Sequence, residues 1–372
     1  LTIIKMKFNE NFFLNTLGQR ILSSHPDLPV NWKFFLHIFI VKFIGYFNIP
    51  VVLYSLLVHD IKSRDLGVIG PDLMILVLYC STSLKYVIMM RYKNLFKSMI
   101  KEINEDYDLA ETWTIEERDI VMAHVKRGQY MANLIFKIMG SVAGLFPITS
   151  VLMMMYNKKL KYVWNITFPE PMESIKFNPW IFVAVNTSFT CTSMYLSLIY
   201  SVFVPLGPIY MLHCCGQLEV IILRLGKVLS EDEVENDNAE QKLKNIAILY
   251  FYVVSYLYST LSCNNHLYAQ SVFELGVEYS AIAIICVTFL TFPCYFSDLL
   301  YQTSNRARLA IYNCGWHRHH SRSRNIMILM LLQRMSRPIT ITTFFNIVNM
   351  ETFSDTLSQA YTIFNVFNAF WN

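Results

Sequence analysis

The residues of this chain that could do chemistry form a polar stripe near its carboxyl end. If residues 344–371 are helical, at 100° per residue, two carboxylates and several hydroxyl or small side chains fall within about 60° of one line. The stripe consists of Glu351, Asp355, Ser358, Thr362, Asn365, Val366 and Ala369. A helix in lipid must turn such a stripe towards water or protein, because an unsatisfied polar group costs several kcal/mol in hydrocarbon. The pattern therefore predicts a pore lining or a polar contact between helices, and it leaves both open.

Other groups that could catalyse a reaction or bind a metal are weak candidates. No glycine-rich phosphate loop, dinucleotide fingerprint or His-Glu-x-x-His motif occurs. The run from His317 to His320 lies among arginines that would repel a cation, and His213-Cys214-Cys215 has no partner pair of ligands. We expect a solvated basic loop at the first place and helix packing at the second. We therefore predict no enzyme activity, no metal site and no cofactor.

The composition indicates that most of the chain lies in lipid. Of 372 residues, 54% are hydrophobic and 16% are charged, whereas soluble domains carry about 25% charged residues. Seven apolar stretches reach the roughly 20 residues that a helix needs to cross a hydrocarbon core. They are Phe34–Val58, Pro71–Met90, Gly128–Tyr156, Ile181–Leu212, Ile246–Gln270, Val277–Leu300 and Phe344–Trp371. The alternation of a barrel strand is absent, so we predict an all-α membrane protein with seven transmembrane helices.

The distribution of Lys and Arg predicts the orientation of these helices. The amino-terminal segment and every second loop hold 22 of the 31 basic residues, and the opposite loops hold six. Cytoplasmic segments retain the excess, so we expect a cytoplasmic amino terminus and an extracellular carboxyl terminus. The glycosylation sequon at Asn165 falls in a loop assigned to the outside, which agrees, whereas Lys158, Lys159 and Lys161 in the same loop do not. Lys42, Lys85 and Lys137 lie inside spans, near enough to the inner side to reach the interface.

Several classes of protein fit this sequence poorly. The net charge of +4 is dispersed, which disfavours binding to nucleic acid. The orientation is opposite to that of G-protein-coupled receptors, and the third span lacks their acidic-Arg-aromatic triplet. A secondary transporter would need an ionisable group at mid-membrane or inverted repeats, and neither is evident. Residues 1–33 have no short apolar core with a cleavage site, so we expect no removable signal peptide.

The outer halves of the second, third, fourth and sixth predicted helices are rich in Met, aromatic and small residues. Ser141, Gly144 and Ile148 share one face of the third helix. At comparable depth on the other helices lie Tyr79, Met194, Tyr195, Leu198, Tyr279 and Ile282. Such surfaces usually pack against other helices. Lining a cavity, they would suit a small volatile apolar molecule with one polar group, and the sequence leaves both interpretations open.

Motifs in the last third of the chain resemble those of insect odorant receptors in order and spacing. They are Pro293–Phe296, Tyr312–Trp316, Arg337–Thr340, Met350–Leu357 and Ala360–Phe364. The segment His213–Glu219, followed by Arg224 and Leu225, also resembles the family at the inner end of the fourth helix. Gustatory receptors are the alternative within the superfamily, but Asn365–Phe370 does not supply their closing Gln-Phe motif.

The resemblance implies a subunit of an odorant-gated, non-selective cation channel that assembles as a heterotetramer with the odorant receptor co-receptor. It implies location in the cell membrane, on the dendrites of olfactory sensory neurons. The chain would be a single domain: a cytoplasmic tail 1–33, six helices with an outer ligand pocket 34–300, a cytoplasmic anchor region 301–343 and a pore-lining helix 344–372. Asn325–Arg337 would supply the intracellular part of the seventh helix.

The resemblance also suggests roles for particular residues. The odorant pocket would use Tyr79, Ser141, Gly144, Ile148, Met194, Leu198, Tyr279 and Ile282. The pore would use Glu351, Asp355, Ser358 and Thr362, with the family's constriction at Val366, Ala369 and Phe370. The last two depart from the Gln and Leu of the family, so partner subunits would dominate the gate. We expect Glu351 and Asp355 to concentrate cations at the pore mouth, or else only to complement the positive end of the helix dipole.

Overall fold

The computed structural model of this chain is built almost entirely from helices. It describes residues 7–29, 31–63, 66–158, 160, 162–164, 166–230, 276–313, 322–342 and 347–371. Within these ranges, β-structure is limited to an isolated antiparallel bridge between Thr342 and Ile347. The helices are α1 (Phe8–Asn11), α2 (Phe13–Ile21), α3 (Trp32–Tyr46), α4 (Ile49–Tyr54), the π-helical turn η1 (Ser55–Asp60), α5 (Ile61–Ser63), α6 (Leu66–Arg91), α7 (Lys93–Ala110), α8 (Ile115–Asn157), α9 (Glu170–Glu173), α10 (Pro179–Phe203), α11 (Leu206–Ser230), α13 (Gly276–Asn313), α14 (Arg322–Arg334) and α15 (Met350–Trp371). The predicted all-α class is confirmed.

Six of the seven predicted spans fall on these helices. In chain order they lie in α3 to η1, α6, α8, α10 to α11, α13 and α15, whereas the predicted span Ile246–Gln270 lies outside the described residues. Among the described residues, Trp32–Asp60, Ile115–Tyr156 and Pro179–Lys227 are long and apolar enough to cross a membrane by length and composition. The number of spans and the orientation of the termini stay predictions.

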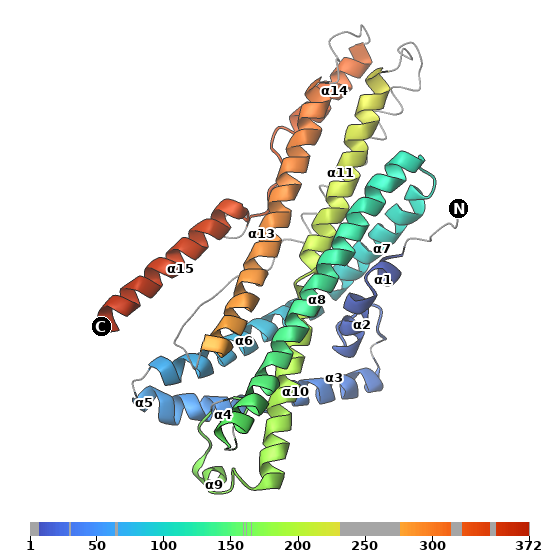
Figure 1. The fold of residues 1–372 in the computed structure, drawn as a ribbon. Coiled ribbons are helices and arrows are strands. Elements are labelled where there is room, and N and C mark those ends of the chain that lie inside the picture. The colour runs from blue at the N-terminus through green and yellow to red at the C-terminus, as the bar shows by residue number, and fades with distance from the viewer. Residues whose placement is uncertain are drawn as a thin grey trace.

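The long helices extend well past the stretches that were predicted to span lipid. α8 has 43 residues, which is about 65 Å of helix, against a hydrocarbon core of about 30 Å. It begins at a capping box in which Thr114 and Glu117 satisfy each other's backbone N–H groups. Figure 1 shows α8, α11 and α13 running in similar directions, with α7 beside the first half of α8. The predicted loop of residues 91–127 is therefore mostly α7 and the start of α8.

The core of the fold lies where α7, the first half of α8, α11, the second half of α13 and α14 meet. α11 is enclosed by its neighbours, since Cys215, Leu218, Val220, Ile221 and Leu225 have no exposed surface. A helix that is apolar around most of its circumference belongs in an interior. Cys214 and Cys215 are free thiols in this core, as expected for packing residues.

Charged side chains connect the same helices at the rim of the core. The guanidinium of Arg224 in α11 donates to Glu117 of α8 at 2.7 Å and lies over the Trp113 ring. Arg306 of α13 donates to Glu219 of α11 at 2.9 Å. Burial opposes ionisation of Glu117, but the hydrogen bonds from Arg224 and from Thr114 outweigh it and hold its pKa below the ordinary value. These pairs fix the register of α8, α11 and α13.

The segment predicted to be a tail is folded onto the other helices. α1 and α2 bury Phe8 and Phe12 in the core. The helical conformation is interrupted between α10 and α11 at Val204 and Pro205, because proline has no N–H to continue the helix. Next to this break the amide of Asn15 donates to the carbonyl oxygen of Val202 at 2.7 Å. The amino-terminal helices thus bind the joint between α10 and α11.

Gly45 provides a test of the packing between α3 and α10. A Cβ at this position would lie 2.3 Å from the Tyr195 ring, so Gly45→Ala must push the two helices apart. We expect a loss of about 1–3 kcal/mol in stability, measured as a lower thermal midpoint of the purified protein in detergent. Gly140→Ala is the matched control, because a Cβ there meets nothing within 4 Å. Equal midpoints for the two variants would contradict this contact.

Candidate functional site

The helices of the outer half are joined by polar contacts as well as apolar ones. Asn48, just before α4, donates to Thr192 Oγ1 of α10 at 2.9 Å and accepts from the Ser188 hydroxyl at 3.0 Å. The Ser55 hydroxyl in η1 accepts from the backbone N–H of Thr167 at 3.1 Å. These buried hydrogen bonds fix α4 and η1 against α10 and the loop before α9. The result is a scaffold on which the predicted pocket residues are placed.

Tyr79 and Leu198 lie together on one side of this scaffold. Tyr79 of α6 is buried, and its ring centroid is 5.6 Å from that of Tyr46 in α3. Leu198 of α10 packs against the same apolar cluster, and its Cδ1 lies 3.6 Å from the position of a Cβ on Gly18. The two residues therefore line the junction of α3, α6 and α10, next to the amino-terminal helix α2.

Ser141, Gly144 and Ile148 lie elsewhere, on an open face of α8. They share one face, as their spacing predicts, and Ile148 is 55% exposed. A Cβ on Gly144 would meet nothing within 4 Å. The opposite face of α8 packs on α10, where the Ser197 hydroxyl donates to the carbonyl of Met139 at 2.6 Å. A wall formed by these three residues thus needs a further element to cover it.

Three further residues complete the account of the predicted pocket. Met194 of α10 is 45% exposed. Tyr279 and Ile282 lie on the first turns of α13, and their side chains are outside the described residues. The structure therefore brings Tyr79 and Leu198 into one cluster and leaves the residues of α8 apart from it. Their role as an odorant site stays a prediction.

The polar stripe near the carboxyl end lies on α15, as predicted. Asn349 caps this helix by accepting from the Thr352 N–H at 2.8 Å. Glu351, Asp355, Ser358 and Thr362 are all exposed, and the side chains of Val366, Ala369 and Phe370 are outside the described residues. Figure 1 shows α15 leading away from the long helices, with α13 as its neighbour. The apolar side is partly open too, since Leu357 is 38% exposed.

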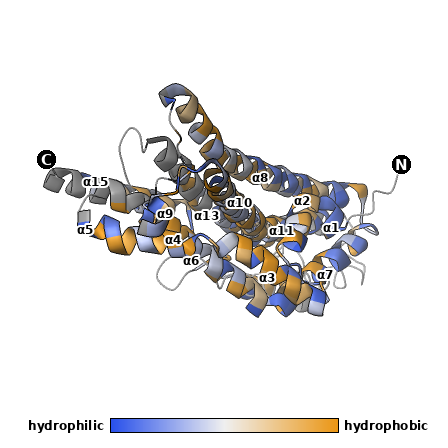
Figure 2. Cartoon of the chain, turned by 90° about the horizontal axis from the view of Figure 1, so that it is seen from below, coloured by the Kyte–Doolittle hydropathy of each residue, from blue (hydrophilic) through white to orange (hydrophobic). Residues whose placement is uncertain are grey.

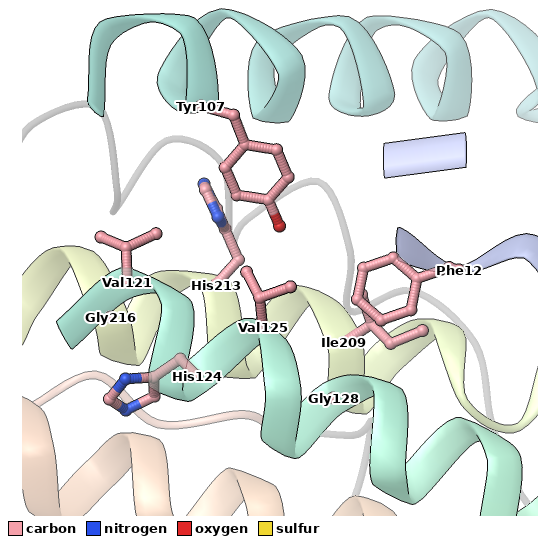
Figure 3. A pocket seen from close by; sticks show the side chains of 9 residues that line it. All are labelled: Phe12, Tyr107, Val121, His124, Val125, Gly128, Ile209, His213 and Gly216. Carbon is pink, nitrogen blue, oxygen red and sulfur yellow. The ribbon is translucent and has the colours of Figure 1, made fainter. Parts of the chain in front are cut away.

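The core contains a small cavity that sequence reasoning did not find. Figure 3 shows His213 of α11 beneath Tyr107 of α7, and His124 of α8 on the other side. His213 Nε2 and Asp106 Oδ2 are 2.8 Å apart, and burial together with the Asp106 charge raises the pKa of Tyr107. The cavity has room for about one water molecule, so it does not suit an organic ligand. No spacing could reveal a pair whose members are 107 residues apart in sequence.

Two smaller expectations concern modification and metals. Asn165 of the predicted sequon lies outside the described residues, while its neighbours Trp164 and Ile166 are buried. Within the described ranges, no three His, Cys, Asp or Glu side chains come together as a metal site would require.

Comparison with known structures identifies the architecture. The olfactory receptor OR5 of the insect Machilis hrabei in complex with eugenol superposes with a TM-score of 0.67 and 11% sequence identity, covering 96% of this chain and 98% of that one. Another structure of the same receptor gives a TM-score of 0.66 and 12% identity, with 96% and 99% covered. At this identity the likeness shows a shared fold. No curated protein sequence matches this chain.

The family was identified from the sequence itself. The family model described as "7tm Odorant receptor" matches residues 65–273 and 274–361. This match covers most of the chain, including α6 to α11, α13, α14 and slightly more than half of α15. The chain therefore belongs to the odorant receptor family, as its carboxyl-terminal motifs predicted.

Proposed function

We propose that this chain is the ligand-tuning subunit of an odorant-gated cation channel in the cell membrane. It binds a small volatile organic molecule in the outer half of α6, α8, α10 and α13 and, together with the odorant receptor co-receptor, opens a pore lined by α15. The observation that carries this proposal is the exposed polar stripe of α15 in a member of a receptor family. Exposed carboxylates and hydroxyls in a membrane helix require water or protein beside them.

One polar helix cannot enclose water, so a pore requires several subunits around an axis. The open position of α15 supports this, because both its polar and its apolar sides are exposed. In an assembly the polar side would face the conduit, and the apolar side, which carries Leu357, would face neighbouring helices. We propose a heterotetramer, in which partner subunits supply the constriction residues that Ala369 and Phe370 replace in this chain.

The proposed ligand site uses the open face of α8. The space beside Gly144 and the exposed Ile148 offer an apolar wall, and dispersion and burial would supply most of the binding energy. The OR5 receptor forms a complex with eugenol, which supports a ligand of similar size here. α13 carries Tyr279 and Ile282 and also packs against α15, so it would connect the site to the pore. The odorant shifts gating only by its greater affinity for the open state.

Current measurements on co-expressed chains test the proposed function. We expect an odorant panel to evoke cation current in cells that express this chain with the co-receptor, and none when this chain is omitted. A current that needs only the co-receptor, or none with any odorant despite surface expression, would contradict the proposal.

Gly144→Leu tests the ligand site. The added side chain would fill the space beside α8, and overpacking of about 1–3 kcal/mol corresponds to a rise of roughly 5- to 150-fold in the odorant concentration for half-maximal current. Gly226→Leu is the control, since Gly226 lies in α11, far from the outer half, and is equally unobstructed. An unchanged dose–response curve for Gly144→Leu, with normal surface expression, would remove α8 from the site.

The pair Glu351→Gln and Asp355→Asn tests the role of α15. If these carboxylates concentrate cations, removing both charges should lower single-channel conductance or divalent permeability by about twofold, most clearly at low salt. Glu102→Gln, an exposed carboxylate of α7 that accepts from Ser98, is the matched control. Unchanged conductance would leave the two acids with the dipole-capping role alone.

A further inference from the structure

Lys42 is a cation inside a predicted membrane span. Its ammonium donates to the hydroxyl of Tyr195 in α10 at 3.0 Å. It lies 3.2 Å from the ring centroid of Tyr86 in α6 and 5.3 Å from that of Tyr46 on its own helix. Three helices, α3, α6 and α10, thus place tyrosine side chains around one ammonium group.

Among the described residues, no acid balances the charge of Lys42. In the part of the chain that the structure describes, no carboxylate forms an ion pair with it or acts on its ionisation. An ammonium has three N–H donors, and the Tyr195 hydroxyl accepts from one of them. Cation–π contacts attract the ammonium but bring no negative charge. Ionisable groups within membrane segments are rare, and they usually mark a site of function.

Tyr86 adds a second unsatisfied group to the same place. Its side chain is 8% exposed, and its hydroxyl oxygen is buried without a hydrogen-bond partner. Buried hydroxyls are nearly always hydrogen-bonded. The Tyr86 hydroxyl can therefore donate a hydrogen bond, and so can the remaining N–H groups of the Lys42 ammonium. Two donors, one of them charged, suit an oxyanion.

The surface next to Lys42 indicates what carries that oxyanion. Lys42 itself is half-buried, and at 100° per residue Phe35 lies about 20° from it around α3 and Phe39 about 60° from it. Both rings are exposed, Phe35 by 60% and Phe39 by 68%. Figure 2 shows α3 at the margin of the molecule, coloured as hydrophobic over much of its length. An acyl chain could lie on this face while its charged head reaches Lys42.

We propose that Lys42 and Tyr86, with Tyr195, bind the oxyanion of a membrane-resident amphiphile whose apolar tail lies along Phe35 and Phe39. The oxyanion is the phosphate of an anionic phospholipid or the carboxylate of a fatty acid. This inference rests on α3 lying in the membrane, as proposed above, and it is independent of odorant gating.

Native mass spectrometry of the purified full-length protein tests this site. The protein is titrated separately with phosphatidylglycerol, with oleate and with phosphatidylcholine as the zwitterionic reference. We expect the wild type to bind at least one of the two anions more tightly than phosphatidylcholine. Lys42→Gln should weaken the binding of the more tightly bound anion by about tenfold. Tyr86→Phe, which keeps the ring, should weaken the same binding by a few-fold. The anion that is affected identifies the source of the oxyanion.

Lys85→Gln is the matched control. It removes an ammonium from α6 that lies over a different ring, Tyr200, at 5.0 Å, so the preference for anions should stay. Equal binding of all three probes by the wild type would overturn the proposal. Equal losses in Lys42→Gln and Lys85→Gln, or no loss in both Lys42→Gln and Tyr86→Phe, would overturn it as well.

Discussion

The burial of α11 among its neighbours is the constraint on which the rest of the structure depends. Cys214, Cys215, Leu218, Val220, Ile221 and Leu225 are buried at different angles around this helix, because α8 and α13 pack on it along their inner halves. Close-packed interiors transmit displacement instead of absorbing it. Since α11 continues into α10 through a single break, and α13 reaches α15, a shift at either outer helix has a defined route into the core. Arg224 and Arg306 hold that core in one register.

The outer half is built differently, and the difference suits a receptor. Its helices meet through hydrogen bonds such as Asn48 to Thr192 and through tyrosine rings, while α8 presents Gly140 and Gly144 to open space. A region with fewer packed contacts has arrangements of similar free energy, and a ligand selects among them by its preference for one. The proposed ligand gating would use this difference between a close-packed inner core and a less constrained outer half.

The apolar stretches predicted the helices well, because each helix in lipid must satisfy its own backbone polar groups. Their ends were harder to predict. Residues 91–127 look like a charged loop, yet Met99, Ile103 and Tyr107 form the apolar face of a helix that packs on the core. Spacing placed Ser141 and Ile148 on a common face of α8, but it could not tell which face a neighbour covers. That information lies in contacts between distant segments.

The bond between Asn15 and Val202 has a consequence for synthesis. Its two members are 187 residues apart, and a ribosome that adds about 5–20 residues per second needs roughly 10–40 seconds to make the stretch between them. Throughout that interval the Asn15 amide of α2 has no Val202 carbonyl to bind, although Phe8 and Phe12 can already contact α7 and α8. α2 therefore docks on the joint between α10 and α11 only after those two helices have emerged.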